Sequence, residues 1–334
     1  MILVTGGTGL LGSHLLLELV RQHEEVVAVR RSTSDLEEVK RVFSWYTGEA
    51  DELFRRIDWV EIDLLNGAEV ERVMIDIDRV YHCAGMVSFH AADRREIIRF
   101  NVGSTANMVN ACLAAGVDKL LHVSSSSAIG QPPEGIPATE ELIRAQTPAG
   151  SAYAVSKFRS EMEVWRGMEE GLNAVIVNPA IILGPGFWDR GSSVMFPRVD
   201  RGLRFATPGI TGYVDVRDVV TAMVRLMNSP IIGERYIVSA GDYSFRQIFE
   251  MIAGALGKPR NMKPVSPAFL KFLCRLDAFA GLFTGTRRIT REHVNSAFSE
   301  HRFSSRKLQE ATGMEFTPVE EAIAHVAGIY LAHR

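Results

Sequence analysis

Tyr153 and Lys157 are the residues whose types and spacing most clearly suggest chemistry. They lie in SAYAVSKF (151–158), four positions apart, so on a helix they share one face, one turn from each other. A phenol and an ammonium held this close could exchange a proton with a bound substrate. The same spacing also arises by chance, and a solvated lysine beside a half-buried tyrosine is an ordinary helix surface. The elements around the pair must decide between these interpretations.

A glycine-rich segment near the start of the chain is typical of dinucleotide binding. TGGTGLLG (5–12) follows the apolar stretch ILVT (2–5) and precedes a helical pattern at 13–23, and it satisfies both G-x-G-x-x-G and T-G-x-x-G-x-x-G. Glycines permit the tight turn and a close approach to a pyrophosphate, and the helix start offers unpaired N–H groups. The alternative is a glycine turn that binds nothing. The predicted cofactor contacts are Gly6, Gly9, Leu10, Leu11 and Gly12.

The residues after the next two apolar stretches bear on the choice of cofactor. VRRST (29–33) places Arg30 and Arg31 where an NAD site usually has an acidic residue. A guanidinium suits a 2′-phosphate, so the sequence favours NADP(H), with NAD(H) as the alternative if both arginines are merely solvated. Asp63 and Leu64 in EIDLL (61–65) are candidates for the adenine end. A helix-start aspartate is an equally good interpretation of Asp63.

Alternating strands and helices predict the fold class of the first half. Apolar strands alternating with helical segments imply an α/β, Rossmann-type, doubly wound parallel sheet, which binds ligands at the carboxyl ends of its strands. The expected strands are ILVT (2–5), EVVAVR (25–30), IDWVEI (57–62), RVYHCA (79–84), KLLHVS (119–124) and NAVIVN (173–178).

The alternation breaks after Pro179, which predicts a second, smaller lobe. We expect an NAD(P)-binding domain over 1–178 and a mixed, mainly substrate-binding lobe over 179–334. YVDV (213–216) and RYIVS (235–239) are expected to be strands that return to the Rossmann side.

The composition is that of a globular protein with a sizeable core. Of 334 residues, 46% are apolar and 23% are charged, and the net charge of −3 argues against nucleic-acid binding. Three scattered cysteines predict neither a disulfide framework nor a metal site, which favours the reducing cytoplasm. We expect no signal peptide and no membrane span. The stretch PVSPAFLKFLCRLDAFAGLFTG (264–285) is expected to be an amphipathic pocket cover, with membrane-surface contact as the alternative.

These motifs together resemble the extended short-chain dehydrogenase/reductases, the NAD-dependent epimerase/dehydratase family. The resemblance covers nearly the whole chain. In having an arginine after the second strand, the sequence is most similar to the dihydroflavonol-reductase-like and 3β-hydroxysteroid-dehydrogenase-like branches of this family. The motifs that carry the resemblance are TGGTGLLG (5–12), IDLL (62–65), HCAG (82–85), HVSS (122–125), YAVSK (153–157), VNPAIILGPG (177–186), GYVDVRDVV (212–220) and FSSRKLQEATG (303–313).

The resemblance implies a Ser–Tyr–Lys catalytic set. Tyr153 would exchange a proton with the substrate oxygen, Lys157 would bind the nicotinamide ribose and lower the pKa of the tyrosine, and Ser125 would orient the same oxygen. Ser126 and Ser127 are alternatives for the serine, or substrate contacts. Ionising a tyrosine at pH 7 costs about 4 kcal/mol. One ammonium about 4 Å away, at an effective dielectric of 20, supplies about as much.

The resemblance also assigns roles to residues around this set. Asn101 would support the lysine through a water, with a helix cap as the alternative. Ala84 and Gly85 would pass close to the cofactor ribose, and Pro179 would lie beside the nicotinamide. Asn178 would lie there too or contact the substrate.

The leading hypothesis is therefore an NAD(P)(H)-dependent oxidoreductase that reduces a carbonyl or oxidises an alcohol of a small molecule. The alternatives are a nucleotide-sugar epimerase with retained NAD and a non-enzymatic dinucleotide sensor, while a 4,6-dehydratase would need an acidic pair where Ser126 and Ser127 stand. The segments near 92–115 and 151–170 are expected to pair in a homodimer. Candidate apolar pocket residues, which are core residues in the alternative reading, are MVSFH (86–90), Phe187, Trp188, Phe196, Phe269, Phe272 and Phe279.

Overall fold

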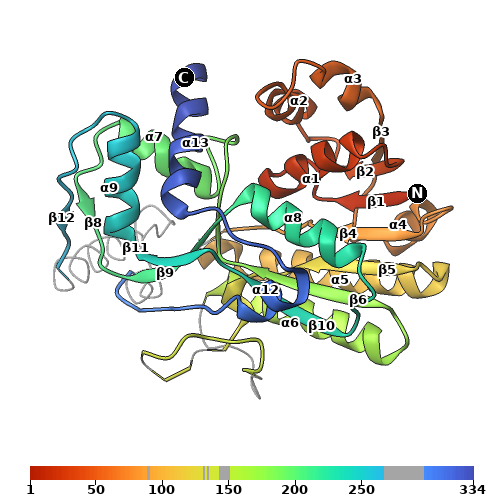
Figure 1. Cartoon of the computed structure of the whole chain (residues 1–334). Helices are drawn as coiled ribbons and strands as arrows, with labels where there is room; N and C mark the ends of the chain where they lie inside the picture. The colour runs from red at the N-terminus through yellow and green to blue at the C-terminus, as the bar shows by residue number, and fades with distance from the viewer. Residues whose placement is uncertain (89–90, 131, 134, 143–150, 267–296) are drawn as a thin grey trace.

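A seven-stranded parallel sheet forms the centre of the protein (Figure 1). The structure is a computed structural model that describes residues 1–88, 91–130, 132–133, 135–142, 151–266 and 297–334. The strand order is β10-β6-β5-β4-β1-β2-β3, which confirms the predicted Rossmann-type sheet. The strands are β1 (Ile2–Thr5), β2 (Val26–Arg30), β3 (Ile57–Glu61), β4 (Arg79–His82), β5 (Lys119–Val123), β6 (Ala174–Pro179) and β10 (Glu234–Val238).

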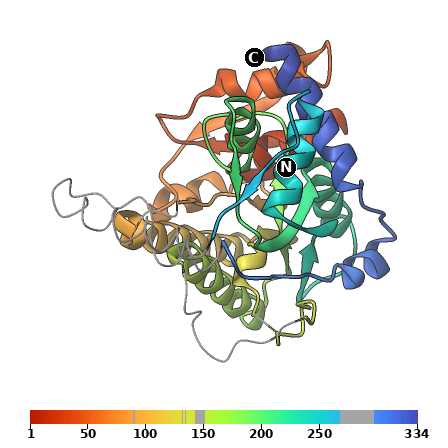
Figure 2. The same cartoon turned by 90° about the vertical axis from the view of Figure 1, so that its left-hand side faces the viewer.

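Helices cover both faces of this sheet because its strands are apolar on both sides. In β1, Ile2 and Val4 belong to one core cluster and Leu3 to another, as the two-residue period of a strand requires. The first cluster packs under α1 (Leu10–Arg21) and α8 (Val216–Met227), and the second under α5 (Arg94–Ala115) and α6 (Ala152–Glu169). Figure 2 shows α5 and α6 side by side. The remaining helices here are α2 (Leu36–Ser44), α3 (Ala50–Arg55), α4 (Gly67–Val73) and α12 (Arg306–Thr312).

The second lobe stands beyond the carboxyl ends of the strands. A three-stranded sheet of order β11-β9-β7 packs against α9 and α13, around a core that includes Phe196 and Tyr213. The strands of this lobe are β7 (Ile181–Leu183), β8 (Phe205–Ala206), β9 (Ile210–Asp215), β11 (Gly241–Ser244) and β12 (Lys263–Pro264). Its helices are α7 (Met195–Asp200), α9 (Phe245–Ala255) and α13 (Val319–His333).

The two strands expected to return to the large sheet lie in different sheets. The strand predicted at 235–239 is β10, which pairs in parallel with β6 in the large sheet. The strand predicted at 213–216 is β9, which lies in the small sheet, so this placement was wrong. The chain returns through α8 instead, which packs against α1. The domain boundary at 178/179 stays a prediction.

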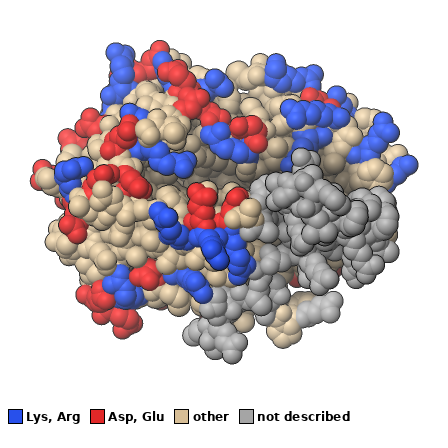
Figure 3. Space-filling view, turned by 180° about the vertical axis from the view of Figure 1, so that it is seen from behind, with Lys and Arg blue, Asp and Glu red and all other residues tan. Residues whose placement is uncertain are grey.

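The charges on one face of the protein and the lengths of the described helices bear on the expected partners. On the face seen in Figure 3, acidic and basic side chains are interspersed. Within the described ranges, no helix combines the length and the apolar character that crossing a bilayer requires. Most of the amphipathic stretch expected over 264–285, with Phe269, Phe272 and Phe279, lies outside the described residues, as do Phe89 and His90.

Candidate active site

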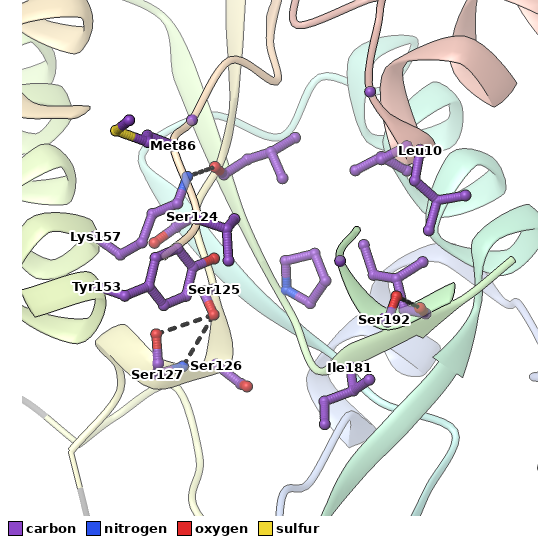
Figure 4. A pocket seen from close by; sticks show the side chains of 18 of the residues that line it. Leu10, Met86, Ser124, Ser125, Ser126, Ser127, Tyr153, Lys157, Ile181 and Ser192 are labelled. Atoms are coloured by element: carbon purple, nitrogen blue, oxygen red, sulfur yellow. Dashed lines mark hydrogen bonds between the residues drawn. The ribbon is translucent and has the colours of Figure 1, made fainter. Parts of the chain in front are cut away.

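A cleft of about 2330 Å³ opens between the carboxyl ends of the large sheet and the second lobe. Figure 4 shows Tyr153, Lys157 and the serines 124–127 on one wall, facing Leu10, Ile181 and Ser192. The cleft therefore brings the glycine-rich segment and the Tyr–Lys pair into one space. Predicted site residues that line it are Gly6, Gly9, Leu10, Leu11, Gly12, Arg30, Asp63, Leu64, Ala84, Gly85, Ser125, Ser126, Ser127, Tyr153, Lys157 and Pro179.

The glycine-rich turn has the geometry of a phosphate cradle. Gly6 has a φ of +70°, and a Cβ there would lie 2.7 Å from the backbone nitrogen of Ala84. A Cβ on Gly12 would lie 2.1 Å from the carbonyl oxygen of Gly6. The Gly9 N–H donates to this oxygen at 3.0 Å and closes the turn just before α1. The bare backbone and the open N-terminus of α1 fit a dinucleotide pyrophosphate.

Lys157 is a buried cation in this wall of the cleft. Only 4% of its surface is exposed, and its Nζ donates to the carbonyl of Val123 at 3.0 Å. Burial lowers the pKa of Lys157 to about 8, while the electrostatic influence of Cys83 and Glu161 acts to raise it. A Cβ on Gly85 would lie 2.9 Å from this Nζ, so a larger residue at position 85 would force the ammonium to shift.

Tyr153 lies near the start of α6 and lines the same wall (Figure 4). The helix is capped by Ser151, whose hydroxyl accepts from the Ala154 N–H at 3.2 Å. Burial raises the pKa of Tyr153, and a hydrogen bond with the Ser125 side chain opposes the rise. The net direction is upward, opposite to the lowering that the family resemblance implied, because desolvation of the phenolate dominates.

Ser125 is the serine whose side chain acts to lower the pKa of Tyr153. Its Oγ also accepts from the backbone N–H of Ser127 at 3.2 Å and from the Ser127 hydroxyl at 3.0 Å. Ser126 and Ser127 line the cleft on the same short helical turn, Ser126–Ala128. The hydrogen bond to Tyr153 favours Ser125 over its two neighbours for the orienting role.

Asn101 stabilises the loop after β4 and does not line the cleft. Its Oδ1 accepts from the Met86 N–H at 2.7 Å, and its Nδ2 donates to the Met86 carbonyl and to Ser156 Oγ. These bonds tie the loop that contains Gly85 to α6. The predicted support of the lysine through a water stays a prediction, and the helix-cap alternative is wrong, since Asn101 lies within α5.

Asn178 is fully buried and is not among the residues that line the cleft, so the predicted substrate contact is not supported. Its Nδ2 donates to the carbonyl of Ser125 at 3.0 Å and to Oε1 of Glu161. The other oxygen of Glu161 pairs with Arg235 at 3.2 Å, and Arg235 also donates to the carbonyl of Glu140. Burial raises the pKa of Glu161, and Arg235 and Asn178 oppose the rise.

Sequence reasoning missed Glu161 and Arg235. The available signal was a charged residue in an apolar strand pattern, because Arg235 is the first residue of the predicted strand RYIVS. In the structure Arg235 is only 9% exposed. Among the candidate lining residues, Phe187 lines the cleft, whereas Trp188 and Phe196 pack in the core of the second lobe.

The adenosine end of the predicted site is formed by the segments that follow β2 and β3. Arg30 pairs with Glu61 at 3.1 Å, and its buried Nε has no hydrogen-bond partner among the described residues. Arg31 is exposed and lines the cleft. Asp63 accepts from the Leu65 N–H at 2.9 Å, as a residue that begins a turn would.

The comparisons with known proteins agree with this architecture. The NAD dependent epimerase/dehydratase family model matches residues 2–239. Sterol demethylase protein B from Methylococcus capsulatus is 31% identical over 278 residues, which cover 82% of this chain and 80% of that protein. The putative dihydroflavonol 4-reductase from Synechocystis is 30% identical over 272 residues, covering 78% and 75%. The crystal structure of gox2253 has a TM-score of 0.84 at 24% identity and covers 100% of this chain and 98% of that one.

These matches confirm the resemblance to the extended short-chain dehydrogenase/reductases, and the reading as a non-enzymatic sensor is wrong. The chain is a member of the NAD dependent epimerase/dehydratase family and an NAD(P)-dependent enzyme.

Proposed function

We propose that this enzyme reduces a carbonyl group, or oxidises the corresponding alcohol, of an apolar small molecule with NADP(H). Tyr153 is the proton donor and acceptor, Ser125 orients the reacting oxygen, and Lys157 binds the nicotinamide ribose. A bound nicotinamide would supply or accept the hydride. The observation that carries the proposal is that these three side chains share one wall of a cleft that also contains the glycine cradle.

The proton chemistry suits the reductive direction. Because burial raises the pKa of Tyr153, its phenol keeps its proton at neutral pH and can act as a general acid. The influence of the Ser125 side chain on this phenol supports a role for Ser125 in holding the same substrate oxygen. We expect the Lys157 ammonium, one helical turn from Tyr153, to favour the phenolate that remains after the proton has left.

The substrate half of the cleft supports an apolar compound. Its wall includes Met86, Ile129, Ile181, Met195, Phe249 and Phe303. The names of the two relatives reported above refer to multi-ring compounds, a sterol and a dihydroflavonol. A wall of this kind buries ring systems through the hydrophobic effect.

The preference for NADP(H) rests on Arg30 and Arg31 at the adenosine end. The unpartnered Nε of Arg30 is a buried donor that a 2′-phosphate could satisfy. Asp63 and Leu64 remain the proposed contacts of the adenine.

The second candidate is a nucleotide-sugar epimerase with retained NAD. Arg30 is already paired with Glu61 and so has a partner without a 2′-phosphate. Arg198 and Arg302 also line the cleft, where they could bind a sugar-nucleotide diphosphate. Tightly bound NAD in the purified protein would favour this alternative.

Replacing Tyr153 tests the catalytic assignment. Tyr153→Phe should lower kcat by about 10²–10⁴-fold, the usual contribution of a general acid, and leave the Kd of NADPH unchanged. Stopped-flow turnover and NADPH fluorescence measure the two quantities. Tyr243→Phe is the matched control, since this hydroxyl contacts Glu320 in the second lobe. A Tyr153→Phe variant with full activity would refute the assignment.

A further inference from the structure

The loop GPGFWDRG (184–191) reaches from the second lobe to α2 of the nucleotide-binding side. A Cβ on Gly186 would lie 3.0 Å from Val42 and 3.3 Å from Trp45. The rings of Trp45 and Trp188 have centroids 6.0 Å apart. Arg190 forms ion pairs with Asp189 on its own loop and with Glu38 on α2. The two lobes therefore touch across the cleft at this point.

This contact lies at the adenosine end of the proposed cofactor site. Glu38 is in the first turn of α2, which Asp35 caps directly after the segment that follows β2. Arg190 lines the same cleft as Arg31 and Ser34 of that segment. The ion pair with Glu38 thus holds the guanidinium of Arg190 on the nucleotide-binding side of this cleft.

The backbone of the loop holds Arg190 in position. Phe187 has a φ of +55°, a left-handed conformation that costs a bulky residue about 1–3 kcal/mol. Its buried ring lines the cleft, and the Arg190 guanidinium lies 4.7 Å from the ring centroid. The Arg190 side chain remains 52% exposed, so part of its donor fork is available to a ligand.

We propose that Arg190 binds the adenosine 2′-phosphate of NADP(H) together with Arg30 and Arg31, and that it leaves Glu38 to do so. This inference rests on the proposed function and adds a contact from the second lobe. A phosphate carries more charge than the Glu38 carboxylate and accepts the planar guanidinium fork equally well. The cofactor would then join the two lobes through its 2′-phosphate, which NADH lacks.

Binding measurements on two charge variants test the inference. Arg190→Ala should weaken NADPH binding by at least about tenfold, the effect of losing one hydrogen bond between charged groups, and NADH binding by less than about threefold. Glu38→Gln should leave NADPH binding unchanged or tighten it, because the competing carboxylate is gone. NADPH and NADH fluorescence titrations give the Kd values. Arg306→Ala is the matched control, since Arg306 is exposed and forms an ion pair within its own helix with Glu310.

Each other outcome overturns a defined part of the argument. Equal losses for NADPH and NADH would place the guanidinium at the pyrophosphate. Equal losses in Arg190→Ala and Glu38→Gln would mean that Arg190 only bridges the lobes. If the unmodified enzyme prefers NADPH and Arg190→Ala keeps that preference, the Arg190 assignment alone fails. If the unmodified enzyme prefers NADH, the NADP(H) part of the proposed function fails first.

Discussion

The ammonium of Lys157 has a lowered pKa because it is buried. Its ammonium is buried and has the Val123 carbonyl as a partner, and burial brings its pKa down to about 8. The group is therefore charged below this pH and becomes neutral above it. A cofactor ribose bound by the ammonium should lose this contact as the pH rises through about 8.

We therefore expect the affinity for NADPH to fall between pH 7 and pH 9. Lys157→Met should bind NADPH more weakly at pH 7 and lose most of this pH dependence. Fluorescence titrations at several pH values measure both effects. Lys119→Met is a matched control, because Lys119 is also buried but donates to the carbonyls of Leu226 and Ser229, away from the cleft. An unchanged pH profile in Lys157→Met would assign the titration to another group.

Three elements meet in the buried network behind Ser125. Asn178 lies near the end of β6, Glu161 lies on α6 and Arg235 lies near the start of β10. The two donors of the Asn178 amide are both used, one on the Ser125 carbonyl and one on Glu161. This network links Ser125, the proposed orienting serine, to the helix that contains Tyr153, so we propose that Asn178 acts as a positioning residue.

Asn178→Ala should therefore lower kcat while the KM for the substrate stays nearly constant. It should also lower the free energy of unfolding by about 1–3 kcal/mol, the cost of leaving a buried acceptor unsatisfied. Steady-state kinetics and urea denaturation measure these effects. The control is Asn173→Ala, whose exposed side chain donates to the Asp118 carbonyl. A raised KM with unchanged stability would restore the original prediction that Asn178 touches the substrate.

The elements and motifs that could be predicted from the sequence are those encoded within a short segment of the chain. The strand–turn–helix around Gly6 and the Tyr153–Lys157 spacing are contained in short windows, and the structure has these elements as expected. Glu161 and Arg235 are 74 positions apart, and no short window relates them. The stretch 213–216 likewise predicted a strand, which overlaps β9, yet it contained no information about which sheet this strand would join.

At the scale of the whole molecule, the lobes are joined by elements that return to the large sheet. After the small sheet, α8 packs against α1, and β10 extends the large sheet beside β6. The predicted homodimer through α5 and α6 would add a further contact and stays a prediction. Because α8 and β10 connect the second lobe to the large sheet, we expect both lobes to unfold in one cooperative transition.

NADPH should raise the temperature of that single transition. A ligand that binds only the folded state stabilises it by about 2.7 kcal/mol at 100 times its Kd. For 334 residues, the entropy of unfolding near 60 °C is about 0.7 kcal/mol per kelvin, so Tm should rise by about 4 °C. At equal concentration, NADH should raise Tm by less, because it lacks the phosphate that the arginines are proposed to bind. Differential scanning calorimetry measures both shifts. Two transitions, of which only one moves, would show that the lobes unfold separately, and equal shifts would contradict the preference for NADP(H).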